Sequence, residues 1–367
     1  MMIAPHSSAG RLLRILPPEW VRLIAKGSLG LGARIRWFEP GTVYEVTART
    51  VDRTFLFKPS HRKGSPLLRH DYPKSALSLS NPVIPKPSII NIVGSSIGRA
   101  LKKSPINIHC YESNINHPHA LFSPIEDKLE NIPKFFQHAN SLIARGINDT
   151  WAREGAVFRR ARVTPCKKDT SAEEKLLYAL TNPVKDGLIS RVKETPFFST
   201  YMHQSQGEPL RFWYIDWAAY WKAGGADNKK RSPKEFLKWV EWETTPLPHL
   251  ADLTVPQRQT RIRKLVREEE RHQEELRREE KRTVMGVPAI FKIDPRSRPK
   301  NPKPDTPQPL CHADDRETAQ AFEEEWDEFL KDYHAASADY RGGDFERLFP
   351  AGSFRPPLIR IINEDGT

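Results

Sequence analysis

The sequence predicts an α+β protein with a ferredoxin-like (split βαβ) antiparallel sheet, helices packed on one face, and a mostly helical C-terminal extension. Short runs rich in β-branched and aromatic residues alternate with stretches of helical apolar spacing between residues 42 and 180. Their order is strand, helix, strand, strand, helix, strand, followed by one more helix. From residue 256 onward, highly charged stretches predict helices outside this core.

Each element is predicted from its local pattern. Strands are expected at TVYEVTAR (42–49), INIHCYESN (106–114), NHPHALFS (116–123) and AVFRRARVTP (156–165). Apolar residues at helical spacing predict helices at 89–101 and 132–147. A further helix, SAEEKLLYAL (171–180), begins with an N-cap serine and early acidic residues and should stop near Asn182-Pro183.

Composition divides the chain into five segments. A core domain is expected at 37–201, interrupted at 58–88 by a loop rich in proline, serine and basic residues. The other segments are an N-terminal stretch (1–36), a Trp-rich and charged helical extension (202–293), a Pro-rich linker (294–310) and a C-terminal helix with its tail (311–367). The last helix should present Phe322, Trp326 and Phe329 on one face.

The net charge is +12, from 58 Lys and Arg against 46 Asp and Glu. Such an excess favours polyanionic partners, nucleic acid first, although it would also serve solubility alone. Three widely spaced cysteines predict neither a disulfide framework nor a zinc ribbon, which fits a reducing cytoplasm. No export signal or membrane span is expected, because charges interrupt every apolar run.

Two residue pairs could carry chemistry. His117 and His119 are two residues apart in a predicted strand, so both imidazoles project from one face and could bind one divalent ion. Tyr178 and Asn182 are four apart, which places the phenol and the carboxamide together on a helix. Each pair alone also has an ordinary interpretation as core or surface residues, with Asn182 as a helix end. Only the combination indicates a site.

In order and spacing, these segments resemble the REP-associated tyrosine transposases, which belong to the HUH endonuclease superfamily and are related to insertion-sequence transposases. The similar segments are PGTVYEVTARTVDRTFLF, INIHCYESNINHPHALFSP, FRRARVTPC and LLYALTNPVKDGLI. The last is the most specific, because the family has a tyrosine, three residues and Asn-Pro, then a small basic stretch and Gly-Leu-Val. The resemblance covers about residues 37–201 and makes them the expected catalytic domain.

The resemblance implies a transposase that nicks and rejoins single-stranded or hairpin DNA through a 5′-phosphotyrosyl intermediate, without a nucleotide cofactor. It implies Tyr178 as the nucleophile and His117, His119 and Asn182 as ligands of Mg²⁺ or Mn²⁺. Basic residues beside this site are expected to contact DNA phosphates, although a merely solvated strand is the alternative. These residues are Arg159, Arg160, Arg162, Lys167 and Lys168.

Pro118 departs from the family pattern, which has a bulky apolar residue between the two histidines. Proline removes a strand amide, so the imidazoles could be misaligned. The main alternative is therefore a catalytically inactive or domesticated DNA-binding protein, a repressor or accessory factor with the same fold. An RNA-binding module is the third interpretation, although the predicted strands show no aromatic pair for base stacking. The sequence leaves open the recognised DNA and the choice between monomer and homodimer; a nucleoid-associated, cytoplasmic location is expected.

Overall fold

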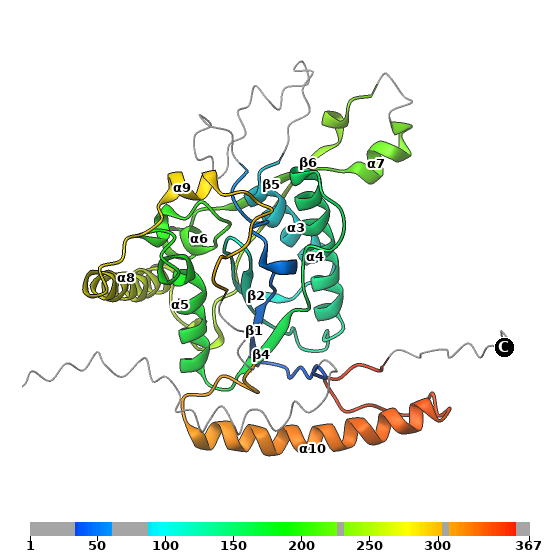
Figure 1. Cartoon of the computed structure of the whole chain (residues 1–367). Helices are drawn as coiled ribbons and strands as arrows, with labels where there is room; N and C mark the ends of the chain where they lie inside the picture. The colour runs from blue at the N-terminus through cyan, green and yellow to red at the C-terminus, as the bar shows by residue number, and fades with distance from the viewer. Residues whose placement is uncertain (1–33, 61–86, 226–230, 303–307, 357–367) are drawn as a thin grey trace, which may run out of the picture.

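The sheet of the core has the strand order of a ferredoxin-like fold. In the computed structural model, which describes residues 34–60, 87–225, 231–302 and 308–356, four antiparallel strands lie in the order β2-β3-β1-β4 (Figure 1). They are β1 (Val43–Thr47), β2 (Asn107–Ser113), β3 (Pro118–Ser123) and β4 (Arg162–Cys166). With the helices between them, the chain order is β-α-β-β-α-β. The predicted α+β class, with an antiparallel sheet and a helical C-terminal region, is confirmed.

Helices α3 (Ile89–Lys103) and α4 (Asn131–Trp151) pack against each other and cover one face of the sheet (Figure 1). The Ser88 side chain accepts from the backbone N–H of Asn91 and so caps the start of α3. Gly146 lets the two helices approach, because a Cβ there would lie 2.6 Å from Cγ2 of Ile92. Tyr44 and Phe122 point from the sheet into this apolar layer.

Helix α5 (Asp169–Lys185) covers the opposite face, where Leu176 and Leu180 pack in one cluster with Leu121. The predicted stop near Asn182-Pro183 was wrong, because the helix continues through Pro183 to Lys185. A proline in the last turn removes only one N–H donor. The buried side chain of Asn182 keeps the turn in place by accepting a 2.5 Å hydrogen bond from Asn114 Nδ2.

The Trp-rich segment contains a two-stranded antiparallel sheet that was not predicted from the sequence. Strands β5 (Leu210–Ile215) and β6 (Leu237–Trp242) pair with each other and pack on α3. Two glycines of α3 permit this: a Cβ at Gly94 would lie 2.5 Å from Phe212, and one at Gly98 would lie 2.7 Å from Trp242. This second sheet therefore completes the core of the first face.

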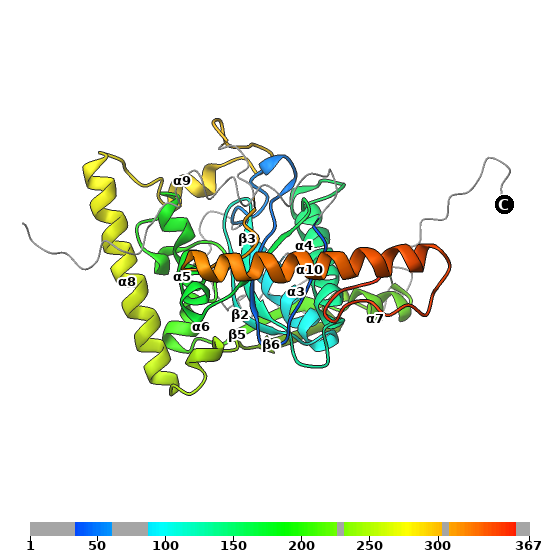
Figure 2. The ribbon, with the colours of Figure 1, turned by 90° about the horizontal axis from the view of Figure 1, so that it is seen from below.

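The remaining helices surround this core (Figures 1 and 2). They are α6 (Tyr201–Gln206), α7 (Trp217–Lys222), α8 (Val255–Glu279), α9 (Val287–Lys292) and α10 (Arg316–Arg341). Short 3-10 helices lie at Val51–Arg53, Val192–Glu194, Pro233–Phe236 and Pro248–Leu250. Helix α8 packs on α5 and α6 through Ile262 and Val266.

Helix α10 confirms the predicted C-terminal helix. It crosses the molecule beneath the sheet (Figure 2), and Phe322, Trp326 and Phe329 are buried together on one side of it. Their cluster includes Trp37, whose ring stacks on Phe329 at 4.7 Å between centroids.

Parts of the predicted organisation lie outside the described residues: nearly all of the N-terminal segment, most of the 58–88 loop, part of the Pro-rich linker and the end of the tail. Among the helices that are described, none combines the length and the apolar character that crossing a membrane requires.

Candidate active site

The two histidines lie side by side, with Pro118 between them in sequence. His117 comes one residue before β3, His119 is the second residue of that strand, and their ring centroids are 4.9 Å apart. Pro118 is the first residue of β3, a position where a strand tolerates proline. Its carbonyl oxygen accepts a 3.2 Å hydrogen bond from the N–H of Ala48. The strand pairing is therefore kept up to the histidines.

Each imidazole is oriented by a hydrogen bond at Nδ1. In His119 this atom lies 3.2 Å from Glu45 Oε1 and 3.1 Å from Thr47 Oγ1, and in His117 it lies 2.7 Å from Asn116 Oδ1. A carboxylate or an amide oxygen only accepts, so each Nδ1 is assigned the proton and each Nε2 keeps a lone pair. This is the outer-shell arrangement that orients metal-binding histidines.

The Nε2 atom of His119 is buried and has no hydrogen-bond partner within the described part of the chain. A buried polar atom without a partner is costly, so such an atom calls for a ligand. Asn182 lies beside His117, close enough for a side-chain hydrogen bond, and is 3% exposed. Two imidazole nitrogens and one amide oxygen are donors that Mn²⁺ or Mg²⁺ accepts, so these residues fit a divalent ion.

The fit relies on the neutral amide of Asn182. Over residues 34–60, 87–225, 231–302 and 308–356, no group of three or more His, Cys, Asp or Glu side chains is placed to hold a metal ion. Water or phosphate oxygens would therefore have to complete the coordination, which leaves room for a phosphodiester.

Tyr178 faces the histidines from α5, as its spacing to Asn182 predicts. Its ring meets His119 edge-on at 5.4 Å between centroids, and the residue is 37% exposed. Burial of the phenol, with the carboxylates of Asp186 and Glu45 nearby, raises the pKa of Tyr178 to about 12. The ammonium groups of Lys175 and Lys185 lie 5.7 and 5.1 Å from the ring centroid. The phenol is thus protonated at neutral pH and has two cations beside it.

His312 joins the site from the far end of the chain, and sequence reasoning missed it. Its Nε2 donates to Glu45 Oε2 at 2.7 Å, while the other oxygen of Glu45 contacts His119. The backbone of His312 pairs with the outer edge of β4, its N–H donating to Pro165 O at 2.8 Å. Burial opposes ionisation of Glu45, but the bonds from His119 and His312 hold its pKa well below its usual range.

The sequence does contain a weak signal for Glu45 and Thr47. Both alternate with buried apolar residues of β1, so their side chains point to the same face of the sheet. His119 is the partner of Thr47 in the strand register and lies on this face too. Nothing local marks His312, which is 267 residues from Glu45. Arg49 was also missed, and its charge acts on both His117 and Tyr178.

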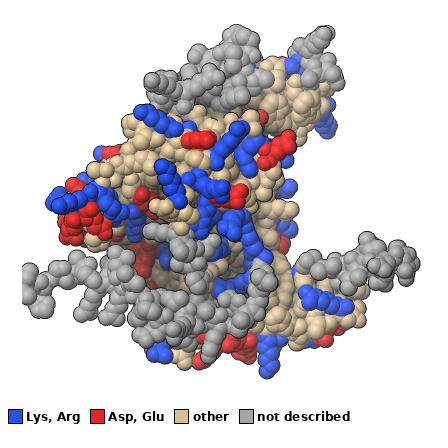
Figure 3. All heavy atoms as spheres, in the orientation of Figure 1, with Lys and Arg blue, Asp and Glu red and all other residues tan. Residues whose placement is uncertain are grey.

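The predicted phosphate-binding residues fall into two groups. Arg159 and Arg160 are exposed before β4, and Arg162 lies directly opposite Thr47 in the sheet. Lys167, in contrast, lies 3.1 Å from Glu39 and 3.5 Å from Glu325, and Lys168 pairs with Asp315. Phosphate contact by these residues stays a prediction. Figure 3 shows Lys and Arg side chains gathered over the middle of the face seen there, whereas basic and acidic side chains are mixed at α8.

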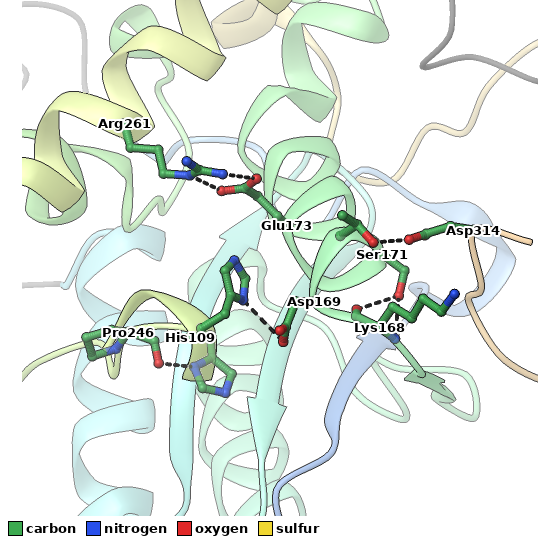
Figure 4. A network of polar contacts seen from close by, with 10 residues as sticks. His109, Lys168, Asp169, Ser171, Glu173, Pro246, Arg261 and Asp314 are labelled. Atoms are coloured by element: carbon green, nitrogen blue, oxygen red, sulfur yellow. Dashed lines mark hydrogen bonds and ion pairs between the residues drawn. The ribbon is translucent and has the colours of Figure 1, made fainter. Parts of the chain in front are cut away.

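The start of α5 is tied to distant parts of the chain (Figure 4). Arg261 of α8 donates to both oxygens of Glu173, at 2.5 and 2.8 Å, and the Thr170 hydroxyl bonds to Asp314. At the other end of α5, Lys185 lies 3.3 Å from Glu269 of α8. The C-terminal segments therefore hold in place the helix that carries Tyr178.

No family profile matches this chain, and no curated protein matches it. Among solved structures, the chain is similar to a REP-associated tyrosine transposase bound to a REP hairpin, at 15% identity and a TM-score of 0.32. The similarity covers 49% of this chain and 90% of the other. Because the identity and the TM-score are both low, this likeness carries no functional conclusion.

Proposed function

We propose that this protein is a transposase-type DNA strand transferase that depends on a divalent metal and nicks and rejoins single-stranded DNA, with Tyr178 as the nucleophile. One observation carries the proposal: the phenol of Tyr178 stands against His119, whose buried Nε2 has no partner in the described residues. A nucleophile thus adjoins a set of metal donors, which phosphodiester cleavage by tyrosine requires.

In the proposed reaction, the Tyr178 oxygen attacks phosphorus and the bond from phosphorus to the 3′ oxygen breaks. The phenol loses its proton, the departing 3′ oxygen gains one, and the 5′ phosphate stays on the tyrosine. Attack by a 3′-hydroxyl on this phosphotyrosine rejoins DNA and restores the phenol, so no nucleotide cofactor is consumed. When held by His117, His119 and Asn182, Mg²⁺ or Mn²⁺ would polarise the scissile phosphodiester.

The surroundings of Tyr178 suit this attack. With a pKa raised to about 12, the phenol has to lose its proton as the new bond forms. The charge of Lys175 beside the ring favours the negative charge that develops on the oxygen, whereas the charge of Lys185 is shared with its partner Glu269. Arg162 pairs with Thr47 on the neighbouring strand, so its guanidinium would be available to contact a DNA phosphate beside the site.

The test is incubation of labelled single-stranded DNA hairpins with Mn²⁺ or Mg²⁺, followed by denaturing electrophoresis. The wild-type protein should form a covalent adduct, Tyr178→Phe should form none, and the control Tyr340→Phe, on α10, should behave as wild type. If the wild type binds hairpins but yields no adduct on any of them, the proposal is wrong and a DNA-binding protein without turnover remains.

A further inference from the structure

A cavity of about 230 Å³ lies at the outer edge of β4, between residues 34–38, residues 308–310 and α10. One part of its wall is aromatic, with Trp37, Phe322 and Trp326. Another part is basic, with Arg36, Arg160 and Arg162, and none of the described residues that line the cavity is acidic. The volume is below the roughly 300–1,000 Å³ of sites for drug-sized ligands, so it suits a single small unit.

The basic part contains two cations that lie close together without a counter-ion. Neither Arg36 nor Arg160 has a carboxylate partner in the portion of the chain that the structure describes. Burial, together with the neighbouring charge of Arg160, lowers the pKa of Arg36. Arg34 differs, because its guanidinium donates to the carbonyls of Pro309 and Gln308 at 2.9 and 3.2 Å. An anion between Arg36 and Arg160 would relieve their repulsion.

The aromatic part is firm enough to hold a planar group. Trp37 stacks on Phe322 at 6.0 Å and on Phe329 at 4.7 Å, with 8° between the planes in both cases. Its indole N–H donates to the carbonyl of Ala351 at 3.1 Å, which fixes the ring. A basic groove combined with rigid aromatic rings is how proteins bind single-stranded nucleic acid.

The cavity is also close to the candidate active site. Arg162 of its wall pairs with Thr47 on β1, and Thr47 pairs with His119 on β3, so β4 and β3 are roughly 10 Å apart. Arg162 shares the sheet face of His119, whereas Tyr44 and Val163 of the wall belong to the other face. A single strand bound at Tyr178 would reach the cavity by passing around the edge of the sheet at β4, a path of a few nucleotides.

We propose that this cavity binds one unpaired nucleotide near the cleaved bond, with its phosphate between Arg36 and Arg160 and its base against Trp37 and Phe322. The proposal rests on the proposed function for the identity of the polyanion. Binding there requires neither the metal nor cleavage, so it can be tested separately.

The experiment measures binding of labelled single-stranded oligonucleotides by fluorescence anisotropy in EDTA. The full-length double variant Arg36→Gln/Arg160→Gln should bind about tenfold more weakly than wild type. In a plot of log binding constant against log salt concentration, its slope should be shallower by about 0.7, as expected for one lost phosphate contact. The control Arg347→Gln removes an arginine that is paired with Asp339 and should change neither value.

A series of oligonucleotides with a single abasic residue tests the base contact. Wild type should lose about 5- to 100-fold in affinity at one position, as expected for one stacked base, and the double variant should lose this position dependence. An even abasic profile, or a double variant that matches the control, overturns the proposal. If the double variant binds as wild type does and the wild type forms the adduct, only the cavity proposal is wrong. If the double variant loses binding and the wild type forms no adduct, only the strand-transfer proposal is wrong.

Discussion

His109 and His119 lie on neighbouring strands of one sheet and are 3% and 5% exposed, but their rings are used differently. In His109, Nδ1 lies 3.0 Å from the carbonyls of Thr245 and Pro246, and Nε2 lies 3.0 Å from Ser123 Oγ. In His119, only Nδ1 has partners among the residues that the structure describes. Burial alone therefore does not distinguish a structural histidine from a candidate metal ligand. The hydrogen-bond partners of the two ring nitrogens do distinguish them.

The basic residues also differ in whether their charges have partners within the protein. The Lys167 ammonium group is paired with two carboxylates and lies 4.3 Å from the Phe322 ring centroid, so its charge is already used within the protein. Arg36 and Arg160, by contrast, have no carboxylate among the described residues. A polar or charged side chain that lines a cavity without a protein partner indicates a ligand more strongly than its charge or its position alone does.

The largest effect is expected for His119→Gln. Nicking of a hairpin substrate should fall by more than about 1,000-fold, which corresponds to about 4 kcal/mol in activation free energy, because a metal donor is lost. The melting temperature should change little, since the glutamine amide can still donate to Glu45 in place of Nδ1, and among the described residues Nε2 has no partner to lose. The companion variant His109→Gln should lower the melting temperature while the folded fraction still nicks DNA. The reverse pattern would contradict the assignment of the two histidines.

The second prediction concerns pH and His109. Burial lowers the pKa of His109 to about 4, from an ordinary value of 6.5, so the unfolded chain takes up this proton first as pH falls. The contribution of His109 to the free energy of unfolding is complete above pH 6.5. It is lost as the pH falls towards 4, which lowers the free energy of unfolding by on the order of 3 kcal/mol. Urea unfolding at pH 7.5 and 4 should show this loss in the wild type and not in His109→Gln. The exposed His334→Gln control should retain it.

A smaller effect is expected for His312→Phe. The new ring keeps the volume but cannot donate to Glu45, so Glu45 should orient His119 less firmly. Mn²⁺ affinity, measured by calorimetry without DNA, should fall about 10- to 100-fold, as for other outer-shell changes at metal sites. His334→Phe provides the matched control. Equal Mn²⁺ affinity in His312→Phe and wild type would remove His312 from the site.

The smallest effect is expected for Lys167→Gln, which breaks the pairs with Glu39 and Glu325. Because these groups are partly exposed, the free energy of unfolding should fall by no more than about 1 kcal/mol, and by less at high salt. The salt dependence of DNA binding should match that of wild type. A shallower dependence would show that Lys167 contacts phosphate after all.

Local spacing determined much of what the sequence alone could establish. Side chains alternate along a strand, which placed His117 and His119 on one face, and residues four apart share a helix face, which placed Tyr178 beside Asn182. Both could be predicted because backbone geometry sets the direction of a side chain within a few residues. The order of strands and helices followed from the same periodicities. The helix end at Asn182-Pro183 failed because burial of Asn182 and its bond to Asn114, neither of them local, hold the last turn.

Only the tertiary structure decided which distant segments meet. Periodicity indicates that a residue faces a neighbour, but it does not say which neighbour, because contacts across hundreds of residues depend on how whole elements pack. Hence no pattern near Glu45 indicated that His312 would bind its carboxylate, and none indicated that Trp37 and α10 would close a cavity on β4. The sequence determined the directions of the site residues, and packing determined their partners.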